Sequence, residues 1–131
     1  MIKYSAINYQ DEAGATDEQD YSKIQARMSN EFNAKMLHYA MGMNTEAAEF
    51  IDNVKKTVIY GKEFDKTNAI EELGDQLWYI SRALETLGST FEEAMSINMA
   101  KLKARYGDKF TEEKAINRDL NKERKALENG Q

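Results

Sequence analysis

The apolar residues between positions 70 and 87 recur at steps of three and four without interruption. They are Ile70, Leu73, Leu77, Ile80, Leu84 and Leu87. Side chains at this spacing share one face of an α-helix, so the segment is expected to form an amphipathic helix. The chain has no proline, and three periodic segments end at a glycine, as helices often do: Gly61, Gly88 and Gly107. An all-α fold is therefore predicted.

The N-terminal half is expected to contain two more helical stretches. Residues 1–15 show no period and are interpreted as a loosely held arm, followed by a helix at 16–28. A second stretch is predicted at 33–60, either continuous or divided near Gly42, because Asn44 and Thr45 are good N-cap residues. Its expected buried stripe consists of Ala40, Ala47, Ile51, Val54 and Val58.

The C-terminal half is predicted from capping signals. The third helix should begin near Thr67 or Asn68, and residues 89–92, Ser-Thr-Phe-Glu, resemble a capping box that opens the fourth. Thr111 should start a charged C-terminal helix within residues 111–131. Together these elements predict one domain, 1–131, with a four-helix-bundle-like core, an additional C-terminal helix and an oligomeric assembly.

Composition excludes several classes of protein. The 131 residues suffice for one domain, and a net charge of −5 does not favour nucleic-acid binding. Without cysteine there is no disulfide, thiolate metal site or cysteine nucleophile. No apolar run approaches the roughly 18 residues of a membrane span, and residues 1–10 lack a signal-peptide core. A cytoplasmic protein is expected.

Two acidic pairs stand at helical spacing. Glu46 and Glu49 lie on one predicted helix, and Glu72 and Asp75 lie on the next. Residues three apart share a helix face, so two adjacent helices can direct four carboxylates to one point, where Mg²⁺ or Mn²⁺ would relieve their repulsion. The alternative is a solvated acidic face on a non-catalytic helical interaction protein.

Other side chains suit a nucleotide. Asn98, Lys101 and Arg105 share one face of the fourth predicted helix and could hold phosphates, or could be a solvated basic stripe. Trp78 and Tyr79 could wall a base pocket, although core packing is the alternative. The only histidine, His38, could contact a base or act in proton transfer, or be an ordinary half-buried residue. It argues against a di-iron site, which needs Glu-x-x-His pairs.

Three ordered segments resemble the MazG-like group of all-α nucleoside triphosphate pyrophosphatases. Residues 45–50, TEAAEF, are similar to the first acidic motif of that family, and residues 71–79, EELGDQLWY, to the second. The stretch from Asn98 to Phe110 is similar to the third. Ala48 stands where glycine is common, and Gly107 where proline often follows the tyrosine; neither difference removes a ligand.

The resemblance implies Mg²⁺-dependent hydrolysis of nucleoside triphosphates to the monophosphate and pyrophosphate by a homodimer or homotetramer, with Mn²⁺ as a substitute metal. It assigns Glu46, Glu49, Glu72 and Asp75 to the metal. It assigns Asn98, Lys101, Arg105 and Lys56 to phosphates. Either Glu49 or Glu71 would accept the proton of the attacking water. Enzymes specific for dUTP or phosphoribosyl-ATP carry the same motif, so the base remains open.

Overall fold

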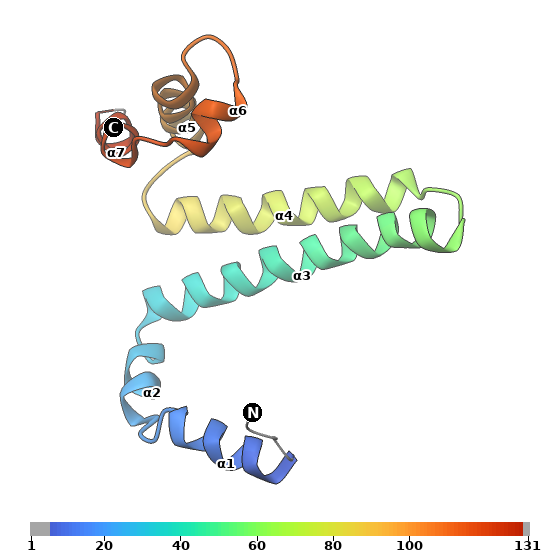
Figure 1. The fold of residues 1–131 in the computed structure, drawn as a ribbon, viewed down its shortest axis with the longest axis vertical. Helices are drawn as coiled ribbons and strands as arrows, with labels where there is room; N and C mark the ends of the chain where they lie inside the picture. Colours follow the sequence, from blue (N-terminus) through green and yellow to red (C-terminus); the bar gives the residue numbers. More distant parts are fainter. Residues whose placement is uncertain (1–5, 130–131) are drawn as a thin grey trace. The chain divides into compact units, whose positions relative to one another are not determined.

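The computed structural model describes residues 6–129, which divide into two units at Ala34. Figure 1 shows that these residues form α-helices and no strand. The helices are α1 (Ala6–Thr16), α2 (Ser22–Met28), α3 (Glu31–Tyr60), α4 (Lys66–Thr86), α5 (Phe91–Tyr106), α6 (Glu112–Ile116) and α7 (Leu120–Glu128). The all-α prediction is confirmed. None of the described helices is long and apolar enough to cross a membrane.

The first unit differs from the prediction at both helices. Residues 6–16 form α1 where an arm was expected, while residues 1–5 of that arm lie outside the described part. The predicted 16–28 helix is reduced to α2. Asp17 accepts a hydrogen bond from the backbone of Glu18, and Asp20 accepts from both the backbone and the hydroxyl of Ser22. Such local side-chain bonds compete with helical ones, which explains the break.

The helix α3 runs without interruption through the glycine at which a break was considered. The Thr45 hydroxyl donates to the carbonyl oxygen of Gly42 at 2.9 Å, so it bonds back within the helix instead of capping a new one. The helix ends where Gly61 adopts a φ of 66°, which an L side chain adopts with strain.

A side-chain cap begins the helix that follows each of the loops after α3 and α4. Asp65 caps α4, since its Oδ1 accepts from the Asn68 backbone N–H at 3.0 Å. The predicted capping box is displaced by one residue: Thr90 caps α5 by accepting from the backbone of Glu93. The Glu93 carboxylate accepts from the Ser89 hydroxyl at 2.6 Å.

Helices α3 and α4 lie side by side and antiparallel (Figure 1). Their acidic sides face each other, since carboxylates of both helices converge there. Their buried residues are Tyr39, Gly42 and Asn53 on α3, and Ala69, Glu72 and Ala83 on α4. The prediction of a buried stripe on α3 is wrong: Ile51 is 63% exposed and Val58 is 72% exposed. On α4, Leu77 of the apolar pattern is 54% exposed as well. The converging carboxylates occupy the side between the helices, so the stripes point elsewhere.

The C-terminal segment forms two short helices instead of one. Asp119 caps α7 by accepting from the Lys122 backbone N–H at 3.0 Å, which starts a new helix after α6. Helix α7 packs against α5 around Glu123, whose side chain is 5% exposed. Its carboxylate accepts from the guanidinium groups of Arg105 on α5 and Arg118. This ion-pair cluster joins the C-terminal residues to α5.

Candidate metal centre

Three carboxylates from two helices converge between α3 and α4. Glu46 on α3 and Glu72 and Asp75 on α4 each offer one oxygen, and these oxygens lie within 4.8 Å of one another. Residues three apart on α4 lie on the same face, which brings Glu72 and Asp75 to the same side. Glu72 is 4% exposed, Glu46 is half-buried and Asp75 is exposed. The group therefore has a buried member, Glu72, between the two helices and is accessible to solvent at Asp75.

The electrostatics of this group favour a cation. Burial raises the pKa of Glu46, and the negative charges of Glu49, Asp75 and Glu72 raise it further, as does a side-chain hydrogen bond with Glu72. A positive ion bound between these oxygens would reverse the repulsion. Carboxylate oxygens are the donors preferred by Mg²⁺ and Mn²⁺, so the donor set fits such an ion.

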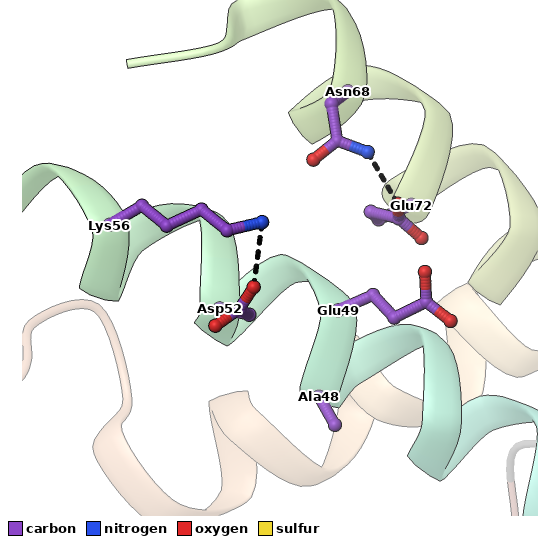
Figure 2. A pocket seen from close by; sticks show the side chains of 6 residues that line it. All are labelled: Ala48, Glu49, Asp52, Lys56, Asn68 and Glu72. Atoms are coloured by element: carbon purple, nitrogen blue, oxygen red, sulfur yellow. Dashed lines mark hydrogen bonds and ion pairs between the residues drawn. The ribbon is translucent and has the colours of Figure 1, made fainter. Parts of the chain in front are cut away.

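A pocket of about 360 Å³ adjoins the carboxylate group (Figure 2). It is lined by Ala48, Glu49, Asp52, Lys56, Asn68 and Glu72. Figure 2 shows the Glu49 carboxylate extending toward Glu72. Glu71, the other candidate base, is exposed and does not line this pocket.

The pocket carries one positive charge, from Lys56. Its Nζ lies 2.7 Å from Oδ2 of Asp52. The hydrogen bond with Lys56 lowers the pKa of Asp52, and the same bond raises the pKa of Lys56. Both groups are thereby held in their charged forms. Neither Asp52 nor Asn68 was predicted to belong to the site, because their place in the pocket depends on which faces of α3 and α4 meet.

The predicted phosphate-binding residues of α5 differ in their surroundings. Asn98 is exposed and Lys101 is half-buried. Arg105 donates from Nε and Nη2 to Glu123 at 2.9 and 2.5 Å. Within residues 6–129, no hydrogen bond or ion pair links these three side chains to the carboxylate group. Their role at a phosphate stays a prediction, and for Arg105 a phosphate would compete with Glu123.

The three residues assigned to a base pocket are linked by ring contacts. His38 meets Tyr79 edge to face, with ring centroids 5.8 Å apart, and Trp78 meets Tyr79 in the same way at 4.9 Å. Edge-to-face contact is a favourable arrangement of aromatic rings. Trp78 is 53% exposed, so part of this aromatic group is accessible. Binding of a base here stays a prediction.

Gly42 sets how closely the helices approach beside the carboxylates. A Cβ at this position would overlap the ring of Tyr79. Gly42 stands one helical turn before Glu46, and Tyr79 stands one turn after Asp75. Because glycine has no side chain, the Tyr79 ring can pack directly on the α3 backbone. The close contact therefore holds the helices together one turn from the site.

Replacing Gly42 with alanine is expected to destabilise the protein. Gly74→Ala is the matched control, since an added Cβ there meets nothing within 4 Å. Both changes should stabilise the helix by about 1 kcal/mol through the higher helix propensity of alanine. Only G42A also forces Tyr79 to move, which should destabilise the protein by about 1–3 kcal/mol. Urea denaturation should show G74A to be more stable than G42A by that difference. Equal stabilisation by the two changes would contradict the close contact.

Comparison with known families identifies the chain. No curated protein and no solved structure gave a significant match. A family model of the MazG nucleotide pyrophosphohydrolase domain matches residues 34–110, more than half of the chain. The matched region contains all but the first residues of α3, the whole of α4 and α5, and all four predicted metal ligands. The chain therefore belongs to the MazG nucleotide pyrophosphohydrolase family, whose members act on nucleotide phosphoanhydride bonds.

Proposed function

We propose that this protein hydrolyses nucleoside or deoxynucleoside triphosphates to the monophosphate and pyrophosphate, with Mg²⁺ as the metal and Mn²⁺ as a substitute. The observation that carries the proposal is the convergence of Glu46, Glu72 and Asp75 inside the region matched by the family model. A non-catalytic interaction protein would have no need to bring carboxylates together against their repulsion.

The proposed metal ligands are Glu46, Glu72 and Asp75, with Glu49 at the edge of the pocket. A bound divalent cation would supply neutralisation of the charge that develops on the leaving pyrophosphate. Hydrolysis breaks the bond between the α-phosphorus and the bridging oxygen as a water attacks that phosphorus. We assign Glu49 as the acceptor of the water's proton, because it lines the pocket and Glu71 does not.

The proposed phosphate contacts come from two places in the chain. Lys56 lines the same pocket as Glu72 and can exchange part of its pairing with Asp52 for a phosphate. Asn98, Lys101 and Arg105 on α5 complete the proposed set. The aromatic group of His38, Trp78 and Tyr79 is the proposed contact for the base. These groups recognise features shared by many nucleotides, so dUTP and phosphoribosyl-ATP belong among the substrates to be tested.

Turnover measurements test the proposal directly. Pyrophosphate release should be followed for the eight standard triphosphates, dUTP and phosphoribosyl-ATP, with Mg²⁺ and with EDTA. Release that requires the metal and is lost in Glu49→Gln, with the helical circular dichroism unchanged, is the expected result. A folded protein that releases no pyrophosphate from any of these compounds would favour the helical interaction protein.

We further propose a homodimer or homotetramer in which the apolar stripes of α3 and α4 meet those of a second copy. Support comes from the exposure of large apolar side chains on both helices: Ile51, Val58, Ile70 and Leu77 are all more than half exposed. Ile51 and Val58, like Ile70 and Leu77, stand seven residues apart and so share one face of their helix, and exposed apolar faces are typical of contact sites on proteins. Two α3–α4 hairpins packed in this way would form a four-helix bundle.

A charge placed in the α3 stripe should break this assembly. Ile51→Glu is expected to lower the molar mass measured by light scattering from that of a dimer or tetramer towards that of a monomer. Burying an unpaired carboxylate in an apolar interface costs several kcal/mol. Thr67→Glu, at an exposed polar position of α4, is the control and should leave the mass unchanged. A wild-type protein that is already monomeric would contradict the proposal.

A further inference from the structure

Asn68 contacts a proposed metal ligand but has no part in the function proposed so far. Its amide nitrogen donates to Oε1 of Glu72 at 2.6 Å (Figure 2). The two residues stand four apart on α4, so the contact is made along one face of the helix. Asn68 also lines the pocket beside the carboxylate group.

Asn68 is itself held in place by a network that reaches α3. Its backbone N–H donates to Oδ1 of Asp65, the N-cap of α4, at 3.0 Å. The backbone oxygen of Asp65 accepts from the side chain of Asn53 on α3 at 2.7 Å. Asn53 is 3% exposed, so the donor of this bond is buried, while Asp65 lies at the surface. The first turn of α4 is therefore tied to α3, and this fixes the backbone position from which the Asn68 side chain reaches Glu72.

The Glu72 carboxylate needs such a donor. It lies close to the carboxylates of Glu46 and Asp75, which repel its charge, and the Glu49 carboxylate extends toward it. No basic side chain among the described residues pairs with Glu72. A neutral amide can satisfy one oxygen without neutralising the group, and it leaves the second oxygen available to a cation. Outer partners of this kind orient metal ligands, and their loss commonly weakens binding 10- to 100-fold.

We propose that Asn68 is a positioning residue of the metal centre: its amide holds the Glu72 carboxylate in the orientation that binds the divalent cation. This inference rests on the proposed function, because it requires that Glu72 bind a metal. It adds a specific residue outside the acidic motifs and a physical role for it.

Metal affinity without nucleotide tests the role. Mn²⁺ binding should be measured by calorimetry for the full-length wild type, Asn68→Ala, Asn68→Leu and Asn68→Gln. Alanine and the near-isosteric leucine both remove the donor, and each should weaken binding about 10- to 100-fold. Glutamine keeps a donor on a longer side chain and should recover part of the loss. The backbone cap on Asp65 survives in all three variants, so their helical content should stay unchanged.

A control and three outcomes make the test decisive. Asn121→Ala, at an exposed position of α7, should bind Mn²⁺ as the wild type does. In turnover assays, Asn68→Ala should raise the half-saturating Mg²⁺ concentration more than it lowers the rate at saturating Mg²⁺. Wild-type Mn²⁺ affinity in both donor-less variants would overturn the role of Asn68 and leave the proposed function standing. A wild-type protein that binds no Mn²⁺ would overturn both.

Discussion

Glu72→Gln is expected to abolish Mg²⁺-dependent turnover without destabilising the metal-free protein. Glu72 is the most buried of the three converging carboxylates, and glutamine keeps its shape and its ability to accept from Asn68. Loss of a ligand should cost more than the roughly 10- to 100-fold typical of an outer partner. The metal-free variant should unfold at the same temperature as the wild type or a higher one, because one repelling charge is gone.

The same variant should change how stability and metal binding depend on pH. Because the pKa of Glu46 is raised, this carboxyl group keeps its proton in the metal-free folded state at pH values where it has lost it in the unfolded state. Its stability therefore falls as pH rises through that raised pKa, and Mn²⁺ affinity falls as pH drops through it, since protons compete for the oxygens. Both trends should be weaker in Glu72→Gln.

The control is Glu63→Gln, in the exposed connector before α4, which should leave both pH trends as they are in the wild type. Wild-type turnover in Glu72→Gln would contradict the site.

Glu123→Gln is expected to give the largest loss of stability from removing one charge. Its buried carboxylate binds two guanidinium groups, from Arg105 and Arg118, and glutamine would leave both without their counter-charge. Hydrogen bonds from Arg118 and Arg105 lower the pKa of Glu123 to about 2. The stabilisation is present above the ordinary value of 4.5 and is lost as pH falls from there towards about 2.

Hydrogen exchange and acid titration check this second expectation. Amides of α7 should exchange faster in Glu123→Gln, and the variant should lose the stability change that the wild type shows between pH 4.5 and about 2. The exposed pair of Arg124 and Glu128 provides a control. Glu128→Gln should cost no more than about 0.5 kcal/mol, as surface pairs on a helix generally do. Equal effects at the two positions would show that α7 does not depend on the buried cluster.

The spacing of apolar residues predicted most of the helices, because a helix that packs on one side carries apolar residues at steps of three and four. The uninterrupted pattern from Ile70 to Leu87 lies almost entirely in α4, and the glycines at 61, 88 and 107 all adopt positive φ at helix ends. Local competition was harder to foresee. The turn at Asp17 and Asp20 depends on side chains that bond their own backbone, and those bonds leave no periodic signal.

Three of the four carboxylates in the acidic pairs meet in one group, whereas the predicted apolar stripe of α3 is largely exposed. Spacing of three shows that Glu72 and Asp75 share a face, but only the contact of α3 with α4 shows that Glu46 meets them. The stripe containing Ile51 and Val58 looked internal because an amphipathic pattern usually marks the face of a helix that packs, but in this chain that face is exposed. The roles of Gly42 and Asn68 were not predicted because each depends on a contact in the folded protein. Gly42 packs against Tyr79 of the neighbouring helix, and Asn68 donates to Glu72 one turn along its own helix.

The identity of the products tests the central claim most directly. Phosphorus NMR of a reaction run with Mg²⁺ in ¹⁸O-labelled water distinguishes attack at the α-phosphorus from attack at the γ-phosphorus. The account predicts an ¹⁸O-labelled monophosphate together with unlabelled pyrophosphate, and neither product with Glu72→Gln. A nucleoside diphosphate with labelled inorganic phosphate, or the same products from Glu72→Gln, would contradict a pyrophosphohydrolase centred on the carboxylates of α3 and α4.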